Sequence, residues 1–117
     1  MTTREAAERW ARTWERAWHE HDSSAIVALY AAGAYFQSHP FREAQPVEEY
    51  VEQVFGEEEE ATPVFHDPIV GGERAAVEWQ AQTRLRDGSS EDLTGVSLLR
   101  FDAEGLVVEQ RDVWSQR

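Results

Sequence analysis

The chain has 117 residues and a formal net charge of −12, and it contains no cysteine. This length fits one domain with a real hydrophobic core, and the lack of cysteine excludes disulfides and thiolate metal sites. The acidic charge disfavours nucleic acids and anionic membrane surfaces as partners. No apolar run is long enough to span a bilayer and the first residues lack the layout of a signal peptide, so we expect a cytoplasmic protein.

The first predicted element is an amphipathic helix over residues 3–20. Trp10, Trp14 and Trp18 recur in it every four residues, which keeps their side chains on one helical face. The simplest interpretation is that these indoles pack in the core. However, the chain has five tryptophans, and each indole N–H needs a partner when it is buried. So many indoles in a small domain indicate an aromatic cavity, with Trp10 expected to pack at the outer end of the helix.

Two shorter helices and one strand come next. Residues 22–24 provide caps for a second helix, and Gly33 is a reasonable stop for it. An aromatic strand is predicted over residues 34–38. A third helix is predicted over residues 46–56, because the proline that opens it lacks only an N–H that a first helical turn does not use. The acidic run that follows, residues 57–60, is expected to be a solvated loop.

Downstream of residue 62 the pattern changes to strands separated by turns. Four long antiparallel strands fit it, over residues 63–70, 74–86, 92–102 and 106–115. Helices therefore come first and a strand meander follows. This order predicts an α+β fold with the helices on one face of a sheet.

Side-chain alternation assigns the faces of these strands. With Trp79 facing the helices, the inward face of the second long strand is almost purely apolar, and it also holds Ala75, Val77, Ala81, Thr83 and Leu85. With Trp114 facing the helices, the last strand directs inward Leu106, Val108, Gln110 and Asp112. The third long strand is half-apolar on both faces, which indicates that the outer face of the sheet packs against a second copy of the chain.

Asp112 and His39 are the candidate catalytic residues. A carboxylate among apolar side chains is costly unless it is paired, hydrogen-bonded or protonated, and a raised pKa suits general acid or base chemistry. The alternative is that Asp112 lies in water at the frayed end of its strand or pairs with an arginine. His39 leaves the aromatic strand before a proline, so it should stand at a rim, as a proton-transfer group or as an ordinary polar residue. His19 and His21 complement the dipole at the end of the first helix and are interpreted as structural.

Metal, nucleophile and phosphate sites are not indicated. His19 and His21 cannot share a helical face, and no other cluster has metal-ligand spacing. No nucleophile-elbow motif is present, and the pair Gly71-Gly72 joins two strands instead of opening a helix. We therefore expect no metal ion and no cofactor.

Together these features resemble the NTF2-like superfamily, in its SnoaL-like or ketosteroid-isomerase-like branch. The resemblance covers nearly the whole chain and rests on the tryptophans of the first helix and on four segments, residues 22–36 (DSSAIVALYAAGAYF), 38–43, 99–105 and 111–114. It implies a cone-shaped fold in which three helices cover a strongly curved antiparallel sheet and enclose a deep, mostly apolar cavity. Members commonly form homodimers through the outer sheet face, and they include isomerases, polyketide cyclases, epoxide hydrolases, dehydratases and non-catalytic binding proteins.

The steroid-isomerase pattern carries over only in part. That family has a catalytic acid before a proline at the end of the strand after the second helix, where this chain has His39 before Pro40. The family's tyrosine in the first helix is replaced by Trp14 or Trp18, and its second acid falls at Ser97. Steroid isomerisation by the usual dienolate route is therefore not expected.

The resemblance also places a tryptophan of the last strand in the cavity, which matches Trp114 and supports an inward Asp112. We therefore expect a pocket for a small, largely apolar, polyketide- or terpenoid-like molecule, with His39 or Asp112 transferring a proton in a cofactor-independent isomerase, cyclase or hydrolase reaction. The residues expected to contact the ligand are Trp14, Trp18, Tyr30, Phe36, Tyr50, Phe65, Trp79, Ser97 and Trp114. The alternative is a non-catalytic, dimeric binding or accessory domain with an aromatic-filled core.

Overall fold

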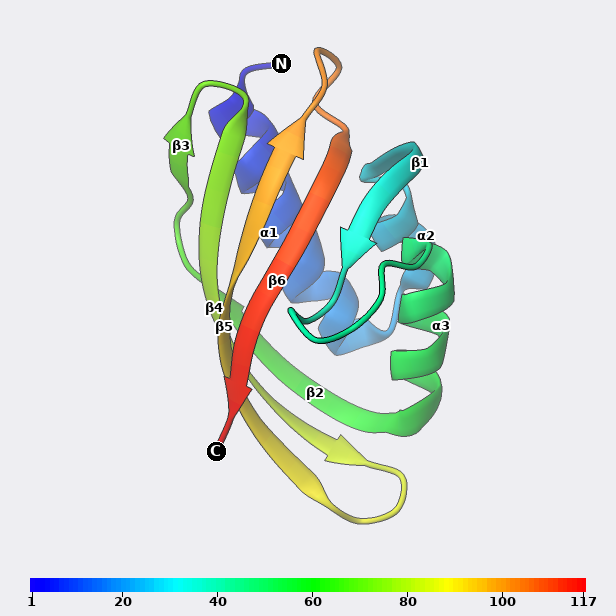
Figure 1. The fold of residues 1–117 in the computed structure, drawn as a ribbon. Coiled ribbons are helices and arrows are strands. Elements are labelled where there is room, and N and C mark those ends of the chain that lie inside the picture. Colours follow the sequence, from blue (N-terminus) through cyan, green and yellow to red (C-terminus); the bar gives the residue numbers. More distant parts are fainter.

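A computed structural model describes all residues, 1–117, as three helices packed against one curled sheet (Figure 1). The helices are α1 (Thr3–Glu20), α2 (Ser23–Val27) and α3 (Val47–Glu57). The strands are β1 (Tyr30–Gln37), β2 (Glu58–Phe65), β3 (Ile69–Gly71), β4 (Arg74–Leu85), β5 (Ser90–Phe101) and β6 (Val107–Gln116). None of the helices is long and apolar enough to cross a membrane.

The sheet has the strand order β1-β6-β5-β4-β2, with β3 paired to the edge of β4. Neighbouring strands from β2 to β6 are antiparallel, whereas β1 runs parallel to β6. The predicted α+β class, with helices on one face of a strongly curved sheet, is confirmed. The sheet is mixed instead of purely antiparallel, because the first strand comes from the helical half of the chain and returns beside the last one.

Helix α1 has the predicted bounds and lies across the inner face of the sheet (Figure 1). A capping box opens it, since the Thr2 hydroxyl accepts from the Glu5 N–H while the Glu5 carboxylate accepts from the Thr2 N–H. It ends at His21, which caps the helix in the left-handed conformation at φ 56°. Its buried face consists of Ala6, Ala7, Trp10, Ala11, Trp14, Ala17 and Trp18.

Several of the predicted boundaries are wrong. The second helix ends at Val27 instead of near Gly33, because Tyr30 already pairs with Val107 of β6 as the first residue of β1. The acidic run 57–60 is not a solvated loop, because Glu58 opens β2 and is only 3% exposed. Strand β2 also ends at Phe65, residues 66–68 form no strand, and a short separate strand, β3, begins at Ile69.

The predicted faces hold along β4 but change partway along β6. Every residue predicted to face inward on β4 is buried or half-buried. On β6, Gln110 and Asp112 are buried as predicted, but Val107 is buried in place of Val108. The cause is a register irregularity in the β5–β6 pairing between Arg100 and Phe101, which shifts the alternation by one residue.

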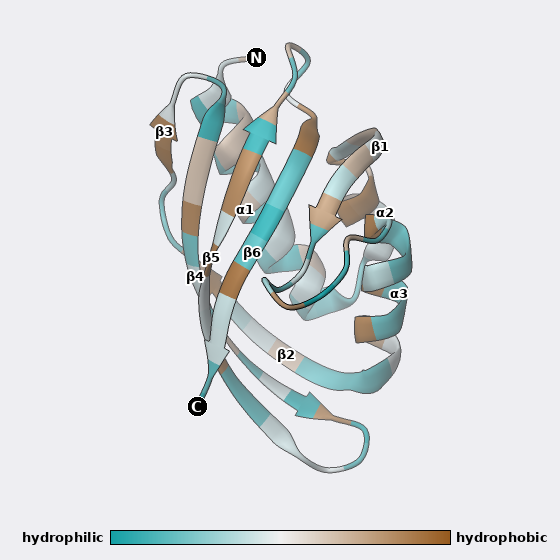
Figure 2. Cartoon of the chain, viewed as in Figure 1, coloured by the Kyte–Doolittle hydropathy of each residue, from teal (hydrophilic) through white to brown (hydrophobic).

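The outer face of the sheet keeps some apolar side chains in contact with solvent. Leu98 of β5 and Val113 of β6 are about half exposed, and Tyr35 of β1 is also exposed. In Figure 2 these strands alternate between hydrophilic and hydrophobic segments along their length. The inner face, under α1 and α3, instead lines a cavity.

Candidate functional site

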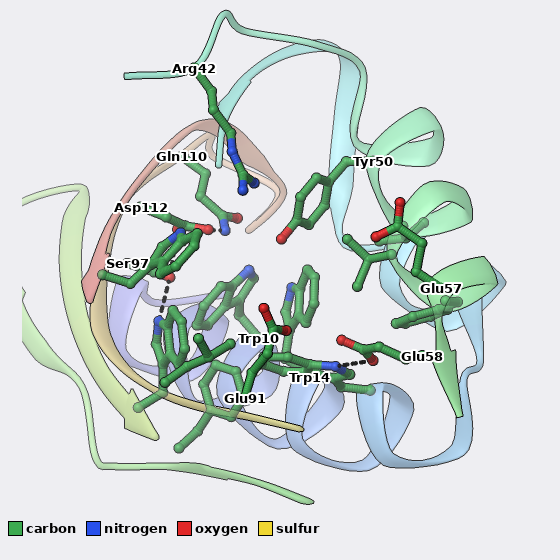
Figure 3. Close-up of a pocket in the computed structure, with 18 of the residues that line it drawn as sticks. Trp10, Trp14, Arg42, Tyr50, Glu57, Glu58, Glu91, Ser97, Gln110 and Asp112 are labelled. Atoms are coloured by element: carbon green, nitrogen blue, oxygen red, sulfur yellow. Dashed lines mark hydrogen bonds between the residues drawn. The ribbon is translucent and has the colours of Figure 1, made fainter. Parts of the chain in front are cut away.

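A cavity of about 150 Å³ lies between the helices and the inner face of the sheet (Figure 3). All five tryptophans line it, together with side chains from α3 and from β2, β4, β5 and β6. Of the residues predicted to contact a ligand, those that line the cavity are Trp14, Trp18, Tyr50, Phe65, Trp79, Ser97 and Trp114. Tyr30 and Phe36 do not line it, because they are buried in the core behind it.

Trp10 also lines the cavity, although the sequence pattern placed it at the outer end of the helix. Its indole is 1% exposed, and its Nε1 donates to the Tyr30 hydroxyl at 3.2 Å. Trp14 donates to the same hydroxyl at 3.0 Å. The Tyr30 hydroxyl is therefore the shared acceptor of both indole N–H groups. These two hydrogen bonds explain why a tyrosine is buried at this point.

Asp112 faces the cavity from β6 and is only 8% exposed. Its Oδ1 accepts hydrogen bonds from the Ser97 hydroxyl at 2.7 Å and from Gln110 Nε2 at 3.0 Å. No arginine pairs with it, so the expected alternative of a frayed or arginine-paired residue does not describe this geometry. Burial raises the pKa of Asp112 to about 7, and the two hydrogen bonds only partly oppose that rise.

The hydrogen bonds around Asp112 have a fixed direction. An indole N–H can only donate, so the Ser97 hydroxyl, which accepts from Trp79 Nε1, must give its own hydrogen to Asp112. On the other side, the Tyr30 hydroxyl accepts from two indoles and therefore donates to Gln110 Oε1. This bond turns the Gln110 amide so that its Nε2 points to Asp112.

It follows that Asp112 Oδ1 is the last acceptor of two relays that begin at tryptophans. Because Oδ1 already receives two hydrogens, a proton bound by Asp112 sits on Oδ2, which has no hydrogen-bond partner in the protein. Asp112 is thus held as a carboxyl group with one oxygen fixed by neutral donors and the other left free. Such a group can act as an acid or as a base near neutral pH.

Trp114 closes this end of the cavity. Its Nε1 donates to the Ser38 carbonyl at 2.6 Å, and the Arg42 guanidinium lies 5.3 Å from the centre of its ring. Its partner in β5 is Gly95, where a Cβ would come within 2.5 Å of the Trp114 Cβ. Only glycine at residue 95 therefore lets the indole approach its neighbouring strand so closely.

His39 does not line the cavity. Its ring packs edge-on against Trp114 at 4.8 Å between centroids, and its Nδ1 accepts from the Phe41 N–H at 3.2 Å. The structure therefore brings Asp112 and Ser97 together but leaves His39 on the far side of the Trp114 ring. His39 thus contacts a residue of the cavity wall without lining the cavity itself, and its role as a base stays a prediction.

Sequence reasoning missed a second buried carboxyl group, Glu58. Its Oε1 accepts from Trp18 Nε1 at 2.9 Å and lies 3.5 Å from His21 Nε2. Burial raises the pKa of Glu58 to about 7, the Trp18 hydrogen bond opposes that rise, and the nearby carboxylates of Glu91 and Glu57 add to it. Alternation along β2 is the feature of the sequence that could have indicated this burial. However, Glu58 and the buried Ala61 are three residues apart, and they share a face only because the pairing of β2 with β4 is irregular between Glu58 and Glu60.

A curled sheet whose helices close over an aromatic cavity with a buried carboxyl group defines a protein of the NTF2-like, ketosteroid-isomerase-like fold. A model of the SnoaL-like domain matches residues 10–110 of the chain. The chain therefore belongs to the family of SnoaL-like domains. A comparison with functionally curated proteins finds no match.

Solved structures with the same fold include proteins with and without a described activity. SalBIII, an epoxide hydrolase/cyclase-like enzyme of pyran ring formation in the polyether salinomycin, is 19% identical with a TM-score of 0.81, over 95% of this chain and 91% of that one. An NTF2-like protein of unknown function from Burkholderia pseudomallei is 21% identical with a TM-score of 0.79, over 98% and 92%. A hypothetical protein with a ketosteroid isomerase-like fold from Catenulispora acidiphila, solved in complex with trimethylamine, is 17% identical with a TM-score of 0.80, over 97% and 88%. Similarity at this level establishes the fold alone.

Proposed function

We propose that the chain binds a small, largely apolar molecule in the cavity and exchanges a proton with it through Asp112, as a cofactor-independent isomerase, cyclase or hydrolase. The observation that carries this proposal is the environment of Asp112. The carboxyl group is 8% exposed, lines the cavity, and contacts only neutral donors. A purely structural carboxylate at such a place would be expected to have a cationic partner.

The free oxygen, Oδ2, would carry out the transfer. As a base, the carboxylate takes a proton from the ligand, so that an Oδ2–H bond forms while a C–H or O–H bond of the ligand breaks and its electron pair stays on the ligand. As an acid, the protonated group reverses these steps and protonates a leaving or ring oxygen. The pKa of about 7 populates both forms near neutral pH. The similarity in fold to an epoxide hydrolase/cyclase-like enzyme is consistent with this class of reaction.

The proposal can be tested without knowing the natural substrate. A carboxylate in an apolar site takes the C3 proton of 5-nitro-1,2-benzisoxazole, which breaks the N–O bond and releases a coloured nitrophenolate. We expect wild type to catalyse this reaction with a rate that rises with pH and levels off above about 7. Asp112→Asn should lower the rate by at least about 100-fold, the usual contribution of a general base.

Asp67→Asn is the control, because Asp67 is an exposed aspartate outside the cavity. Its rate should match that of wild type. Equal rates in wild type and Asp112→Asn would remove Asp112 from the chemistry and leave the alternative, a binding or accessory domain without catalysis.

We also propose that two copies of the chain pair through the outer face of the sheet. The exposed apolar side chains of Leu98 and Val113 on adjacent strands support this assembly, because neighbouring apolar side chains on an outer sheet face can be covered by the same face of a second copy. Sedimentation equilibrium of wild type should give a dimer, and Leu98→Glu should shift it to monomer. A monomeric wild type at high protein concentration would contradict this assembly.

A further inference from the structure

The cavity has an acidic end that is separate from Asp112. Glu57 at the end of α3, Glu58 at the start of β2 and Glu91 on β5 all line it, and Figure 3 shows Glu57 and Glu58 on the opposite side of the cavity from Asp112. Glu58 is the most deeply placed of the three, at 3% exposed. Its Oε1 accepts from Trp18, but its Oε2 accepts no hydrogen bond. A carboxyl oxygen of a buried side chain that lines a cavity and has no partner in the protein is available to a ligand.

The protein supplies no positive charge to Glu58. The nearest basic group is His21, whose Nε2 lies 3.5 Å from Glu58 Oε1 but forms no hydrogen bond. The pKa of His21 is lowered by its burial and by the charge of Arg86, which favours the neutral ring. The only arginine that lines the cavity, Arg42, extends instead over Trp114.

The walls near Glu58 are aromatic. Trp18 contacts Glu58 through its N–H, and Trp14 packs edge-on against Trp18 at 6.1 Å between ring centroids. Aromatic rings attract cations, and this attraction grows when the cation leaves water. Carboxyl groups and indole rings around one space therefore match the chemistry of an organic ammonium ion.

We propose that the ligand of this cavity carries a positively charged nitrogen, and that Glu58 and the surrounding indoles hold that nitrogen. This inference rests on the proposed function, since it names the charge of the molecule that the cavity binds. The volume of about 150 Å³ limits the enclosed part of the ligand to a group about the size of benzene. A trimethylammonium group is of that size.

The proposal has a defined pH dependence. The groups that face Glu58 are His21 at the end of α1, Glu57 on α3 and Glu91 on β5, with Arg86 acting on the histidine. Because the pKa of Glu58 is raised to about 7, its carboxylate form is scarce at pH 5.5 and predominant at pH 8.5. Affinity for a cation should therefore increase with pH across this interval, whereas affinity for a neutral molecule should not.

The test compares choline with 3,3-dimethylbutan-1-ol, which has the same shape but a carbon in place of the charged nitrogen. Calorimetric titrations of both compounds are made at pH 5.5 and 8.5 with wild type, Glu58→Gln, Asp112→Asn and Glu52→Gln. Glu52 is an exposed glutamate of α3 outside the cavity and serves as the matched control. Circular dichroism and melting curves confirm that each variant is folded.

We expect wild type at pH 8.5 to bind choline at least tenfold more tightly than the neutral alcohol, and to lose at least tenfold in choline affinity at pH 5.5. Glu58→Gln should remove the preference, while Glu52→Gln and Asp112→Asn should keep it. Equal binding of the two compounds, binding of neither, or loss of the preference in Asp112→Asn but not in Glu58→Gln would overturn the inference. Equal binding would leave the apolar pocket of the proposed function intact, and the benzisoxazole assay tests Asp112 independently of choline.

Discussion

The two ends of the cavity bury one carboxyl group each and hold them differently. At one end Asp112 receives two hydrogen bonds on a single oxygen, from donors whose orientation is fixed by tryptophans. At the other end Glu58 receives one indole hydrogen bond and lies among further carboxylates. Burial raises the pKa of both groups to about 7, so similar pKa values arise in dissimilar surroundings.

This difference in surroundings indicates which of the two carboxyl groups already has its partners in the folded chain. The neutral relays around Asp112 hold it in one orientation before any ligand arrives, as expected for a group that must react. The surroundings of Glu58 add like charges instead of compensating its own, as expected for a group that a bound cation would complete. The following predictions test this contrast, from the largest expected effect to the smallest.

The first prediction concerns the cost of burying Asp112. Its pKa is raised from an ordinary value of 3.8 to about 7, so the folded protein keeps a proton that the unfolded chain releases. The stability linked to this proton is fully present below about pH 4 and is lost as the pH rises to about 7. At about 1.4 kcal/mol for each pH unit between the two pKa values, the loss in wild type is about 4 kcal/mol.

Asp112→Asn should not show this loss, because the amide cannot ionise. Urea unfolding of wild type and the variant at pH 4, 6 and 8 measures the difference in the free energy of unfolding. The free energy of unfolding of the variant should increase steadily relative to that of wild type as the pH increases. A constant difference at all three pH values would mean that Asp112 has an ordinary pKa and a compensated charge.

The second prediction applies the same measurement to the other end of the cavity. The pKa of Glu58 is raised from 4.5 to about 7, so its linked stability is lost as the pH rises between these values, by about 3 kcal/mol. The free energy of unfolding of Glu58→Gln should therefore also increase relative to that of wild type as the pH rises. Saturating choline should reduce this relative increase, since a bound cation stabilises the carboxylate of wild type. Choline should leave the Asp112→Asn difference nearly unchanged, and an equal effect on both would erase the contrast between the two ends.

The third prediction breaks the relay that begins at α1. Tyr30→Phe removes the hydroxyl that accepts from Trp10 and Trp14 and donates to Gln110. Three buried polar groups then lack a partner, so we expect a loss of about 2 kcal/mol in the free energy of unfolding. Tyr35→Phe is the control, because Tyr35 is exposed, and it should change stability by less than about 0.5 kcal/mol.

Much of the fold follows from local patterns in the sequence. The four-residue spacing of the tryptophans predicted the amphipathic helix α1, and strict alternation predicted the inward face of β4. The predictions that were wrong concern features set by contacts between distant segments. The early start of β1 is set by its parallel pairing with β6, and the exchange of Val108 for Val107 is set by an irregularity opposite Phe101. Local alternation carries no information on either feature.

The same division applies to the site. Asp112 could be predicted because it shares a strand phase with Trp114. Glu58 could not, because a run of four consecutive glutamates is typical of a solvated loop, and its burial beside Trp18 and His21 depends on α1, which is distant in the sequence. The donor and acceptor roles in the hydrogen bonds around Asp112 could not be predicted either. They depend on the contact of Trp10 and Trp14 with one tyrosine, Tyr30, from another element.

The last prediction tests the direction of the hydrogen bond between Ser97 and Asp112 by removing one hydroxyl group. Ser97→Ala removes the hydroxyl that donates to Asp112, and because this bond stabilises the carboxylate, the pKa of Asp112 should rise above 7 by about one pH unit. Carbon-13 NMR of labelled aspartate carboxyls follows the titration, with Asp112→Asn to assign the resonance. Ser115→Ala is the control, because Ser115 is an exposed serine of the same strand that pairs with Thr94, and it should leave the pKa of Asp112 unchanged. A lower pKa in Ser97→Ala would mean that the hydroxyl accepts from a protonated Asp112, and the indole of Trp79 would then not determine the polarity of the relay.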